Sequence, residues 1–584
     1  MSPKTSTTTA AARATTKNAE PLVSIRDLEV AFHTHDGDIE AVRGISFDIF
    51  PGETVAIVGE SGSGKSTTAT ALINLLPSNG RITGGEVLVE GRDVTRWSQT
   101  QMAAVRGSVI GYVPQDPMSN LNPVWSVGFQ VREAIRANNV ATGRKEIQAR
   151  AVEVLHQAGL SDSERRMRQF PHQFSGGMKQ RVLIGIGLGA DPRLLIADEP
   201  TSALDVTVQK TILDHIESLT RDKQVALLLI THDLGLAAER ASRVIVMNRG
   251  KIVEAGKSLD ILQRPQHPYT KRLIAAAPSL ASRRIESSAA VVNPDDDKSV
   301  DVARMARERR EDEEAAVTAA QAVVQVRDLT KVFSIRRGSF RSEPLTAVDH
   351  ISFDIHRGTT LALVGESGSG KTTAAKMILG LETPTAGEIT VGGTQLAGVS
   401  RKDLFTLRSH MQPVFQDPYA SLDPQRSIGA IIAEPLRVHK VGDDRSRVAR
   451  VKELLSQVAL PGALAHRYPN ELSGGQRQRV AIARALALKP DVVVLDEPVS
   501  ALDVLVQAQI LQLLADLQAE LGLTYLFITH DLAVVRVVAD EVAVMENGKI
   551  VERGDVDTIF SKPREAYTRR LLDAIPGGNI VFGG

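Results

Sequence analysis

The chain has 584 residues, 69 Lys and Arg against 69 Asp and Glu, 42% hydrophobic residues and no cysteine. The length predicts two or more domains, and the lack of cysteine excludes disulfides, thiolate metal sites and cysteine nucleophiles. A formal net charge of zero gives no overall attraction to nucleic acid or anionic lipid. The longest apolar runs, such as Val225–Ile230 and Val492–Leu495, have the length of strands, so we expect no membrane-spanning helix.

The chain begins with a polar, alanine-rich stretch, residues 1–20, that has no apolar core of a secretory signal. We expect a disordered tail there. Beyond it the sequence repeats itself: GESGSGKST at Gly59 recurs as GESGSGKTT at Gly365, and SGG, DEP, SALD and THD recur 298 residues apart. This pattern predicts a tandem duplication of one domain, with the copies at residues 21–278 and 321–576.

Residues 279–320 between the copies are charged and poor in large apolar side chains, which is typical of a linker. Within this stretch, residues 304–314 carry four arginines against five acids. Helix-forming residues with opposite charges at helical spacing favour a solvated single helix that acts as a spacer, and a binding role is the alternative. The last residues, 577–584, are expected to form a short tail.

Strands are predicted at Glu86–Val89 in the first copy and at Leu361–Val364 in the second, where the strand leads into the glycine-rich loop and an alanine-rich helix. Later, LLIADEP and VVVLDEP each present an apolar run that ends in two carboxylates. A buried parallel strand has this pattern where it emerges at a site. The fold class predicted from these elements is α/β.

Both glycine-rich loops match the pattern G-x-x-x-x-G-K-[ST], in which backbone N–H groups and a helix N-terminus surround phosphate oxygens. Lys65 and Lys371 are expected to reach the β- and γ-phosphates, and Ser66 and Thr372 to offer a hydroxyl to Mg²⁺. The residues predicted to bind nucleotide in the two loops are Gly59, Ser61, Gly62, Gly64, Lys65, Ser66 and Thr67, and Gly365, Ser367, Gly368, Gly370, Lys371, Thr372 and Thr373.

The carboxylate pairs at the strand ends have distinct expected roles. Asp198 and Asp496 suit a Mg²⁺ ligand, and Glu199 and Glu497 suit a general base that polarises the attacking water. Asp-Glu pairs are usually only solvated, but their position after a phosphate-binding loop favours the catalytic interpretation. In each copy a histidine follows the glutamate by 33 residues, His232 in the first and His530 in the second. This identical spacing favours a contact to γ-phosphate and water over a structural role.

These motifs, together with Gln115, Phe174–Arg181 (FSGGMKQR) and their counterparts Gln416 and LSGGQRQR, resemble the nucleotide-binding domain of ATP-binding cassette transporters. The resemblance covers nearly the whole chain outside the tail and linker. It implies two tandem P-loop NTPase domains, each with a RecA-like core, a small antiparallel β subdomain and a helical subdomain that carries the SGG signature. It also implies that Gln115 and Gln416 contact ATP and Mg²⁺.

In that family the signature of one domain closes on the nucleotide of the other, so the resemblance implies two composite ATP sites. The signature residues expected to bind nucleotide are Ser175, Gly176 and Gly177, and Ser473, Gly474, Gly475 and Gln476. Phe174 and Met178 depart from the usual Leu and Gln, so the site that pairs Ser175 with Lys371 could turn over at a different rate. Phe32 and Phe333 match the position of an aromatic that stacks on adenine, with core packing as the alternative and Phe340 competing for the second role.

QDPMSNLNP at Gln115, QDPYASLDP at Gln416 and RPQHPYTKRL at Arg264 resemble the peptide importer group, which includes nickel and glutathione importers. The first copy resembles its D-type subunit and the second its F-type. The resemblance implies two integral-membrane permease subunits, an extracytoplasmic substrate-binding protein, ATP and Mg²⁺ as cofactors, and a peripheral position on the cytoplasmic face of the membrane. Several relatives carry a cysteine-containing tail that binds an iron–sulfur cluster, and this chain has no cysteine for one.

The alternative function is a soluble twin-cassette translation factor that acts on the ribosome. Such a protein also has two cassettes, but its inter-domain segment is strongly basic. The linker here is slightly acidic at residues 304–314, which makes it a poor ligand for RNA. We therefore expect no nucleic-acid partner.

Overall fold

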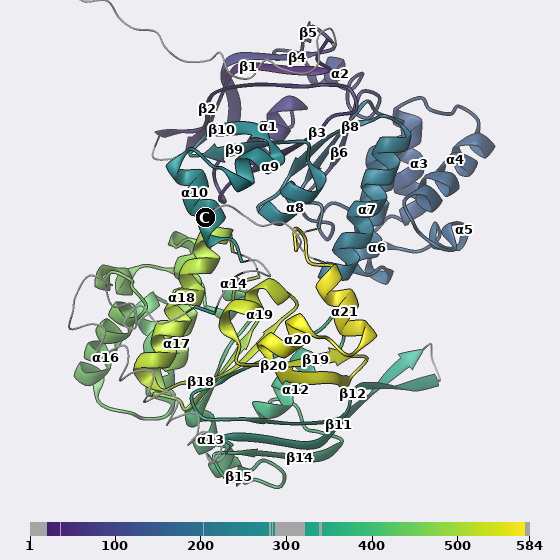
Figure 1. Ribbon diagram of the computed structural model, residues 1–584. Helices are drawn as coiled ribbons and strands as arrows, with labels where there is room; N and C mark the ends of the chain where they lie inside the picture. Colours follow the sequence, from purple (N-terminus) through teal and green to yellow (C-terminus); the bar gives the residue numbers. More distant parts are fainter. Residues whose placement is uncertain are drawn as a thin grey trace, which may run out of the picture. The chain divides into compact units, whose positions relative to one another are not determined.

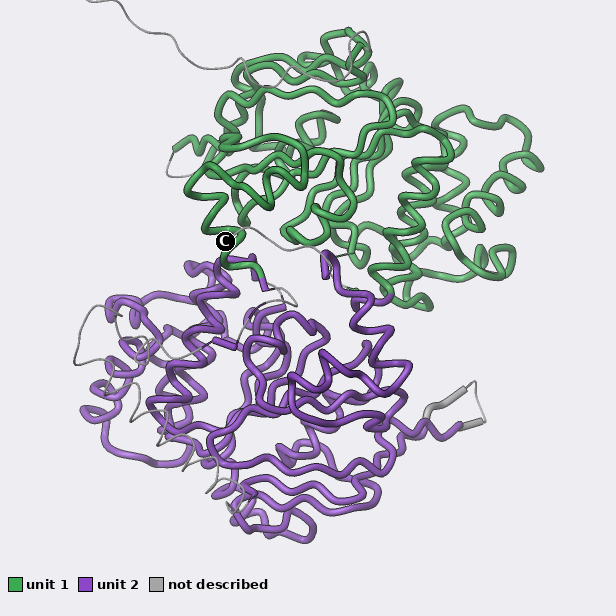
Figure 2. The backbone as a smooth tube through the Cα atoms, in the orientation of Figure 1, with its two compact units in different colours: residues 1–204, 208–277, 579–584 green, residues 205–207, 278–578 purple. Residues whose placement is uncertain are grey.

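The computed structural model describes residues 20–34, 37–201, 204–278, 282, 284–285, 322–337, 341–500 and 502–578. The chain divides into two compact units (Figure 2): the first holds described residues up to 204 and from 208 to 277, and the second holds 205–207 and 278–578. The tail before residue 20, most of the predicted linker, including its helix, Phe340 and residues 579–584 lie outside the described residues. The domain boundaries expected from the sequence stay a prediction.

The first unit contains two sheets, and its elements are those of an α/β domain (Figure 1). Its strands are β1 (Val23–Thr34), β2 (Gly37–Ile49), β3 (Thr54–Val58), β4 (Gly80–Val89), β5 (Arg92–Asp93), β6 (Ile110–Val113), β7 (Leu194–Asp198), β8 (Ala226–Ile230), β9 (Arg243–Asn248) and β10 (Lys251–Lys257). The helices associated with it are α1 (Lys65–Leu72), α2 (Gln99–Met102), α3 (Val127–Ala137), α4 (Arg144–Gln157), α5 (Ser163–Arg166), η1 (Pro171–Gln173), α6 (Gly176–Leu188), α7 (Val206–Asp222), α8 (Leu234–Arg240), α9 (Ser258–Gln263) and α10 (Pro268–Ala276).

The second unit repeats the two sheets with equivalent strand orders, and its described helices include the additional short elements α14 and η5. Its strands are β11 (Val324–Arg337), β12 (Arg341–Ile355), β13 (Thr360–Val364), β14 (Ala386–Val391), β15 (Thr394–Gln395), β16 (Met411–Val414), β17 (Val492–Asp496), β18 (Thr524–Thr529), β19 (Glu541–Glu546) and β20 (Lys549–Asp555). Its helices are α12 (Lys371–Ile378), α13 (Arg401–His410), α14 (Pro418–Ser421), α15 (Ile428–Val438), α16 (Asp444–Gln457), η3 (Gly462–His466), η4 (Pro469–Glu471), α17 (Gly474–Ala485), η5 (Leu486–Leu488), α18 (Val504–Leu521), α19 (Leu532–Val538), α20 (Val556–Ser561) and α21 (Ala566–Asp573).

The larger sheet of each unit is parallel apart from one edge hairpin. Its order is β10-β9-β3-β8-β7-β6 in the first unit and β20-β19-β13-β18-β17-β16 in the second. Strand β13, with sequence TLALV, is buried at every position and contributes side chains to cores on both of its faces. Continuous apolar runs of this kind are required where a parallel sheet is covered on both sides. The predicted strand at Leu361–Val364 is thereby confirmed, one residue longer at its start.

The smaller sheet of each unit is antiparallel, with the order β2-β1-β4-β5 and its counterpart β12-β11-β14-β15. The predicted strand at Glu86–Val89 is the end of β4 and belongs to this sheet. Side chains from β1, such as Val23 and Ile25, share one buried cluster with Ile57 of β3 and Leu72 of α1. The smaller sheet and the parallel sheet are therefore held together around the helix that follows the glycine-rich loop.

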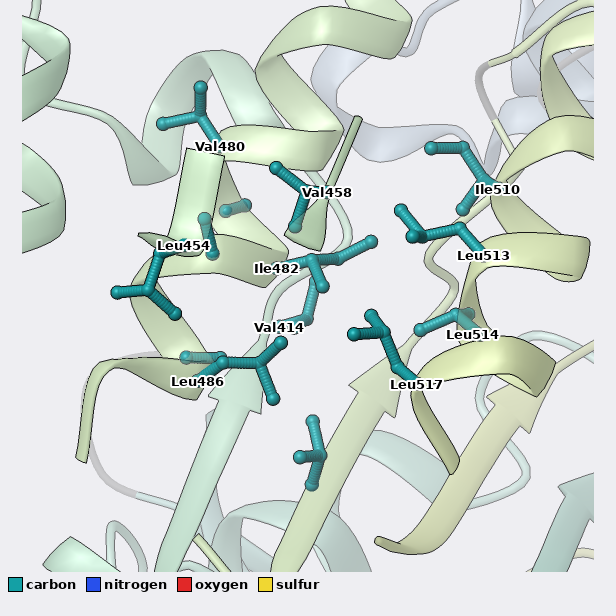
Figure 3. Close-up of a cluster of buried hydrophobic side chains, with 14 of the residues drawn as sticks. Val414, Leu454, Val458, Val480, Ile482, Leu486, Ile510, Leu513, Leu514 and Leu517 are labelled. Carbon is teal, nitrogen blue, oxygen red and sulfur yellow. The ribbon is translucent and has the colours of Figure 1, made fainter. Parts of the chain in front are cut away.

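A helical region lies at the β6 edge of the first large sheet and at the β16 edge of the second (Figure 1). In the second unit, α16, α17 and α18 and strand β16 enclose a dense aliphatic core (Figure 3). Helix α18 is delimited by Asp503, whose side chain accepts from Val506 N, and by Gly522 at φ 65°. Such caps satisfy the terminal backbone groups and fix where the helix begins and ends.

Two residues of the predicted linker, Arg284 and Ile285, lie against the second unit. Arg284 pairs with Asp540, and Ile285 N donates to Val537 O at 2.8 Å. Within the part of the chain that the structure describes, no helix is long and apolar enough to cross a lipid bilayer.

Candidate active sites

The glycine-rich loop of each unit connects the central parallel strand to the following helix. The sequence predicts this strand in the second copy, whereas β3, which leads into the first loop, was not among the predicted strands. Two glycines are required by close approach of the backbone. A Cβ on Gly59 would stand 2.2 Å from Met247 O, and a Cβ on Gly64 would stand 2.6 Å from Ala41 O, with Gly64 at φ 101°. No other residue type fits these positions without displacing the backbone, so the loop conformation is encoded by its glycines.

The loop lysines are folded over their own loops. Lys65 is 6% exposed and its Nζ donates to Gly59 O at 2.8 Å and Glu60 O at 2.9 Å. Lys371 repeats these contacts at 2.7 and 2.8 Å, and burial lowers its pKa. Each ammonium therefore lies at the N-terminal end of a helix, where the helix dipole adds positive potential. This combination fits the polyphosphate of a nucleotide.

The remaining predicted loop residues surround this centre. Ser61 and Gly62 are exposed at the apex of the first loop, and Ser367 and Gly368 hold the same position in the second. Thr67 and Thr373 are half-buried in the first turn of the following helices. The Oγ atom of Ser63 is buried and has no hydrogen-bond partner among the described residues.

A hydroxyl and a carboxylate face each other beside each lysine. Ser66 Oγ donates to Asp198 Oδ1 at 3.0 Å, and Thr372 Oγ1 donates to Asp496 Oδ1 at 3.4 Å. Burial, with a further contribution from the neighbouring Glu199, raises the pKa of Asp198 to about 6, and the pKa of Asp496 is raised for the same reasons. A cation bound here would relieve this cost, because it favours the ionised carboxylate.

These oxygens fit Mg²⁺, which binds proteins through one or two hard oxygen ligands and completes its shell with water and substrate phosphates. No group of three or more acidic, histidine or cysteine side chains that could hold a metal occurs among the described residues. The hydroxyl and carboxylate of each site fit a cation that takes its remaining ligands from water and substrate phosphates.

The two glutamates follow directly after their aspartates in a strained backbone. Glu199 has φ 44° and Glu497 has φ 48°, a left-handed conformation that costs a residue with a Cβ about 1 kcal/mol or more. Both side chains are 14% exposed. Strain of this kind persists only where the surrounding structure holds it. With this backbone conformation, each glutamate carboxylate faces a histidine and a glutamine.

In the first site, Glu199 Oε1 lies 3.3 Å from His232 Nδ1 and its Oε2 accepts from Gln115 Nε2 at 2.8 Å. In the second, Glu497 contacts His530 Nδ1 at 3.1 Å and Gln416 Nε2 at 2.7 Å. The structure thus brings together the glutamate, histidine and glutamine that the sequence places far apart. The expected contacts of the histidines to γ-phosphate, and of the glutamines to Mg²⁺, stay predictions.

Electrostatics couple each histidine to its glutamate. Burial opposes ionisation of Glu199, but the hydrogen bond and charge of His232 outweigh it, so the pKa of Glu199 is lowered. Burial alone would lower the pKa of His232, yet the same contact to Glu199 raises it. Glu497 and His530 shift in the same directions for the same reasons. An ionised carboxylate oriented by a histidine is the arrangement expected of a general base that activates water.

The signature serines begin long helices in their own units. Ser175 caps α6 by accepting from Met178 N at 3.4 Å, and Ser473 caps α17 by accepting from Gln476 N at 3.3 Å. Gln476 also accepts from Ser473 N at 3.0 Å, which completes a capping box that Met178 cannot form. Gly176 and Gly177 and their counterparts Gly474 and Gly475 form the first turns of the two helices.

The predicted adenine-stacking residues lie on the first strands of the small sheets. Phe32 on β1 is half-buried, and it packs against the core between the two sheets. Phe333 on β11 is half-buried beneath Lys331, whose Nζ lies 5.0 Å from the ring centroid. Both the packing role and the stacking role remain compatible with these positions.

Three tyrosines that lie at the sites are not predicted by the sequence motifs. Tyr112 on β6 places its hydroxyl 3.5 Å from Asp198 Oδ2. Tyr269 and Tyr567 accept hydrogen bonds from the backbone N–H groups of Glu60 and Glu366 in the two glycine-rich loops. The only signal in the sequence was that Tyr269 and Tyr567 occupy equivalent places in HPYTKRL and EAYTRRL.

Comparison with known proteins identifies the family of the chain. The family model described as ABC transporter matches residues 42–202 and 348–500, and the model described as oligopeptide/dipeptide transporter, C-terminal region, matches residues 253–296 and 551–579. Each model therefore matches both copies of the repeat. The chain belongs to the ABC transporter family, and it is a two-cassette ATPase that couples ATP hydrolysis to transport.

Two curated relatives match almost the whole chain. The glutathione import ATP-binding protein GsiA of Salmonella paratyphi A is 44% identical over 567 residues, which are 96% of this chain and 90% of its own. The oligopeptide transport ATP-binding protein OppD of Mycobacterium tuberculosis is 42% identical over 604 residues, 95% of this chain and 98% of its own. Among solved structures, cbiO1 of Clostridium perfringens, part of the ABC transporter complex cbiONQ, is 30% identical over 41% of this chain and 91% of its own, with a TM-score of 0.37.

Proposed function

We propose that this chain drives the import of peptides, with di- or oligopeptides as cargo, by binding and hydrolysing ATP at its two cassettes. The observation that carries the proposal is the match of the segment after each cassette core to the oligopeptide/dipeptide transporter C-terminal region. Relatives that span nearly the full chain are named for glutathione import and for oligopeptide transport, which are both peptide cargoes. The ribosomal alternative finds no support among these relatives.

The chemistry follows from the side chains of each site. Lys65 and Lys371 neutralise phosphate charge, and Glu199 and Glu497 accept a proton from the attacking water. His232 and His530 orient the carboxylates, which their hydrogen bonds hold in the ionised form. When bound, Mg²⁺ supplies positive charge to the β- and γ-phosphates, and Ser66 with Asp198, and Thr372 with Asp496, are the residues that would hold it.

The signature helices contribute to the same proposal. In the hydrolysis cycle, the Ser175 helix is proposed to serve the nucleotide at Lys371, and the Ser473 helix the nucleotide at Lys65. The support is the family resemblance together with the position of both serines at the N-termini of helices, where the helix dipole favours a bound phosphate. Gln115 and Gln416 contact the catalytic glutamates, so a partner that moves either glutamine would change the site directly.

Permease subunits are proposed to dock just past these glutamines, on the cytoplasmic face of the membrane, with an extracytoplasmic binding protein delivering the cargo. Large apolar side chains are exposed at this position in the first unit: Met118 at 62%, Val124 at 72% and Trp125 at 48%. Tyr419 is 63% exposed at the equivalent place in the second. Exposed aromatic and apolar residues of this kind favour a protein partner.

Uptake tests the proposal most directly. A strain deleted for this gene should lose uptake of labelled di- and oligopeptides, and the wild-type chain should restore it together with its permeases. Uptake of labelled glutathione in the same strain distinguishes the two cargo classes. Undiminished uptake of all these peptides, with the chain sedimenting on ribosomes, would refute the proposal and favour the translation factor.

A further inference from the structure

In each unit a tyrosine from the C-terminal region reaches back to the glycine-rich loop. Glu60 N donates to Tyr269 Oη at 3.1 Å across 209 residues, and Glu366 N donates to Tyr567 Oη at 3.0 Å across 201 residues. Both tyrosine side chains are buried, at 2% and 5% exposure. The same long-range bond is therefore built twice, once in each copy.

In each unit a glutamate on the preceding edge strand holds the backbone just before the helix that carries the tyrosine. Glu254 on β10 accepts from the backbone N–H groups of Gln266 at 2.8 Å and His267 at 3.1 Å, directly before α10. Glu552 on β20 does the same for Arg564 at 2.7 Å and Glu565 at 3.2 Å, before α21. We call this strand, loop and helix, residues 251–276 and 549–573, the C-terminal brace.

The brace is retained although its sequence differs between the copies. The residues before the tyrosine are His-Pro in the first copy and Glu-Ala in the second. The N-cap of the helix differs as well. In the first copy His267 Nδ1 accepts from Tyr269 N, whereas in the second copy the side chain of Glu565 makes no capping hydrogen bond. Two features are the same in both copies: the hydrogen bond from the loop to the tyrosine hydroxyl, and the glutamate that accepts from the backbone before the helix. This indicates that the contact with the glycine-rich loop is their common role.

The residue whose N–H bonds the tyrosine also binds the lysine of the glycine-rich loop. Glu60 gives its N–H to Tyr269 and its C=O to Lys65 Nζ at 2.9 Å, and Glu366 links Tyr567 to Lys371 at 2.8 Å in the same way. A shift of Glu60 or Glu366 would therefore also move the carbonyl oxygen to which the lysine Nζ donates. Burial raises the pKa of Tyr567 to about 12, so its hydroxyl stays neutral at physiological pH and can accept the bond.

We propose that Tyr269 and Tyr567 are positioning residues for the nucleotide loops: through Glu60 and Glu366 they hold each loop and its lysine in the binding conformation and so set the affinity for nucleotide. The inference rests on nucleotide binding at these loops and deepens the proposed function. Both tyrosines lie in the segments that match the oligopeptide/dipeptide transporter C-terminal region. On this proposal, that region contacts the nucleotide loops directly through the tyrosine hydroxyls.

The test is the double variant Tyr269→Phe with Tyr567→Phe in the full chain, with ADP and ATP dissociation constants measured by calorimetry. Loss of a hydrogen bond to a loop amide is expected to raise both constants about 3- to 10-fold. Because the hydroxyls do not contact the reacting atoms, the hydrolysis rate at saturating ATP should stay within about 2-fold. The matched control is Tyr525→Phe, which removes a buried hydroxyl that donates to Leu514 O at 2.9 Å, away from either loop.

Unchanged dissociation constants in the double variant, or an equal rise in the Tyr525→Phe control, would overturn the proposal. If the tyrosine variants do not fold, the ADP and ATP dissociation constants are measured in Glu254→Gln with Glu552→Gln. This double variant weakens the hydrogen bonds that the two glutamates accept within the C-terminal brace. A rise of both constants supports the proposal, and unchanged constants refute it. The readout is binding to the isolated chain, so failure of peptide uptake, which concerns the proposed function, is a separate result.

Discussion

Replacing the two glutamates by glutamine, Glu199→Gln with Glu497→Gln, is expected to stop ATP hydrolysis and leave ATP binding intact. Glutamine keeps the Cβ and the shape of the side chain, so the strained backbone at φ 44° and 48° is unchanged. Its amide oxygen can still accept from Gln115 and Gln416. What the substitution removes is the negative charge and the ability to take a proton from water.

The size of the effect follows from these contacts. A positioned general base contributes about 10²- to 10⁴-fold to a rate, so the double variant should hydrolyse ATP at most at about 1% of the wild-type rate. Affinity for ATP should hold or rise up to about 3-fold, because a carboxylate near the lysine and the polyphosphate has lost its charge. Stability should change by about 1 kcal/mol or less, since the hydrogen bonds can be kept.

Phosphate release measures hydrolysis, and calorimetry measures binding. The matched control is Glu153→Gln with Glu453→Gln, which removes two carboxylates on α4 and α16 that pair with Arg150 and Arg450 outside the sites. This control should hydrolyse ATP at the wild-type rate. Retention of more than a tenth of wild-type turnover in Glu199→Gln with Glu497→Gln would refute the catalytic assignment.

Four further predictions follow from the same contacts. Lys65→Ala or Lys371→Ala alone should reduce peptide uptake to background, and normal uptake in either single variant would show that the two sites are not needed together. The pKa of His232 and His530 is raised in the folded chain and that of Glu199 and Glu497 is lowered, so both pairs stabilise the fold between about pH 4.5 and 6.5. The free energy of unfolding should therefore fall as pH rises above 6.5, and His232→Gln with His530→Gln should flatten this slope. Burial raises the pKa of Asp198 to about 6, so its ionised carboxylate destabilises the folded chain at pH 7 when Mg²⁺ is absent. Asp198→Asn should therefore raise the free energy of unfolding by up to about 2–3 kcal/mol and raise the Tm. An unchanged or lower Tm would contradict this. Met178→Gln supplies the missing half of the capping box on α6 and should add about 0.5–1 kcal/mol in thermal unfolding, with no gain expected if the box does not form.

The parts of the molecule that the sequence predicts well are those with a local cause. The loop from Gly59 to Ser66 depends on Gly59 and Gly64, where a Cβ would meet backbone atoms, and the apolar runs before Asp198 and Asp496 have the pattern of a buried parallel strand. These short-range constraints are visible in a single stretch of residues. The strand and the loop were therefore identified correctly in both copies.

What the sequence does not reveal depends on distant segments. The positive φ of Glu199 arises where β7 ends beside β8, as Glu199 N donates to Ile230 O, and nothing in the letters DEP signals it. The bond from Glu60 to Tyr269 joins residues 209 apart, and only the fold shows that α10 reaches the loop. Spacing could suggest that His232 belongs to the site, but not that its Nδ1 faces Glu199.

The duplication allows each contact of the site to be compared between two copies whose sequences differ. The lysine, glutamate, glutamine, histidine and tyrosine contacts occur in both copies with distances that differ by no more than about 0.2 Å. The hydroxyl that donates to the aspartate at the strand end comes from a serine in the first copy, Ser66, and from a threonine in the second, Thr372. The capping box at Ser473, absent at Ser175, is a difference in bonding at a predicted nucleotide-contacting position. A difference in turnover between the two sites should therefore originate at the signature helices, and Met178→Gln should reduce it.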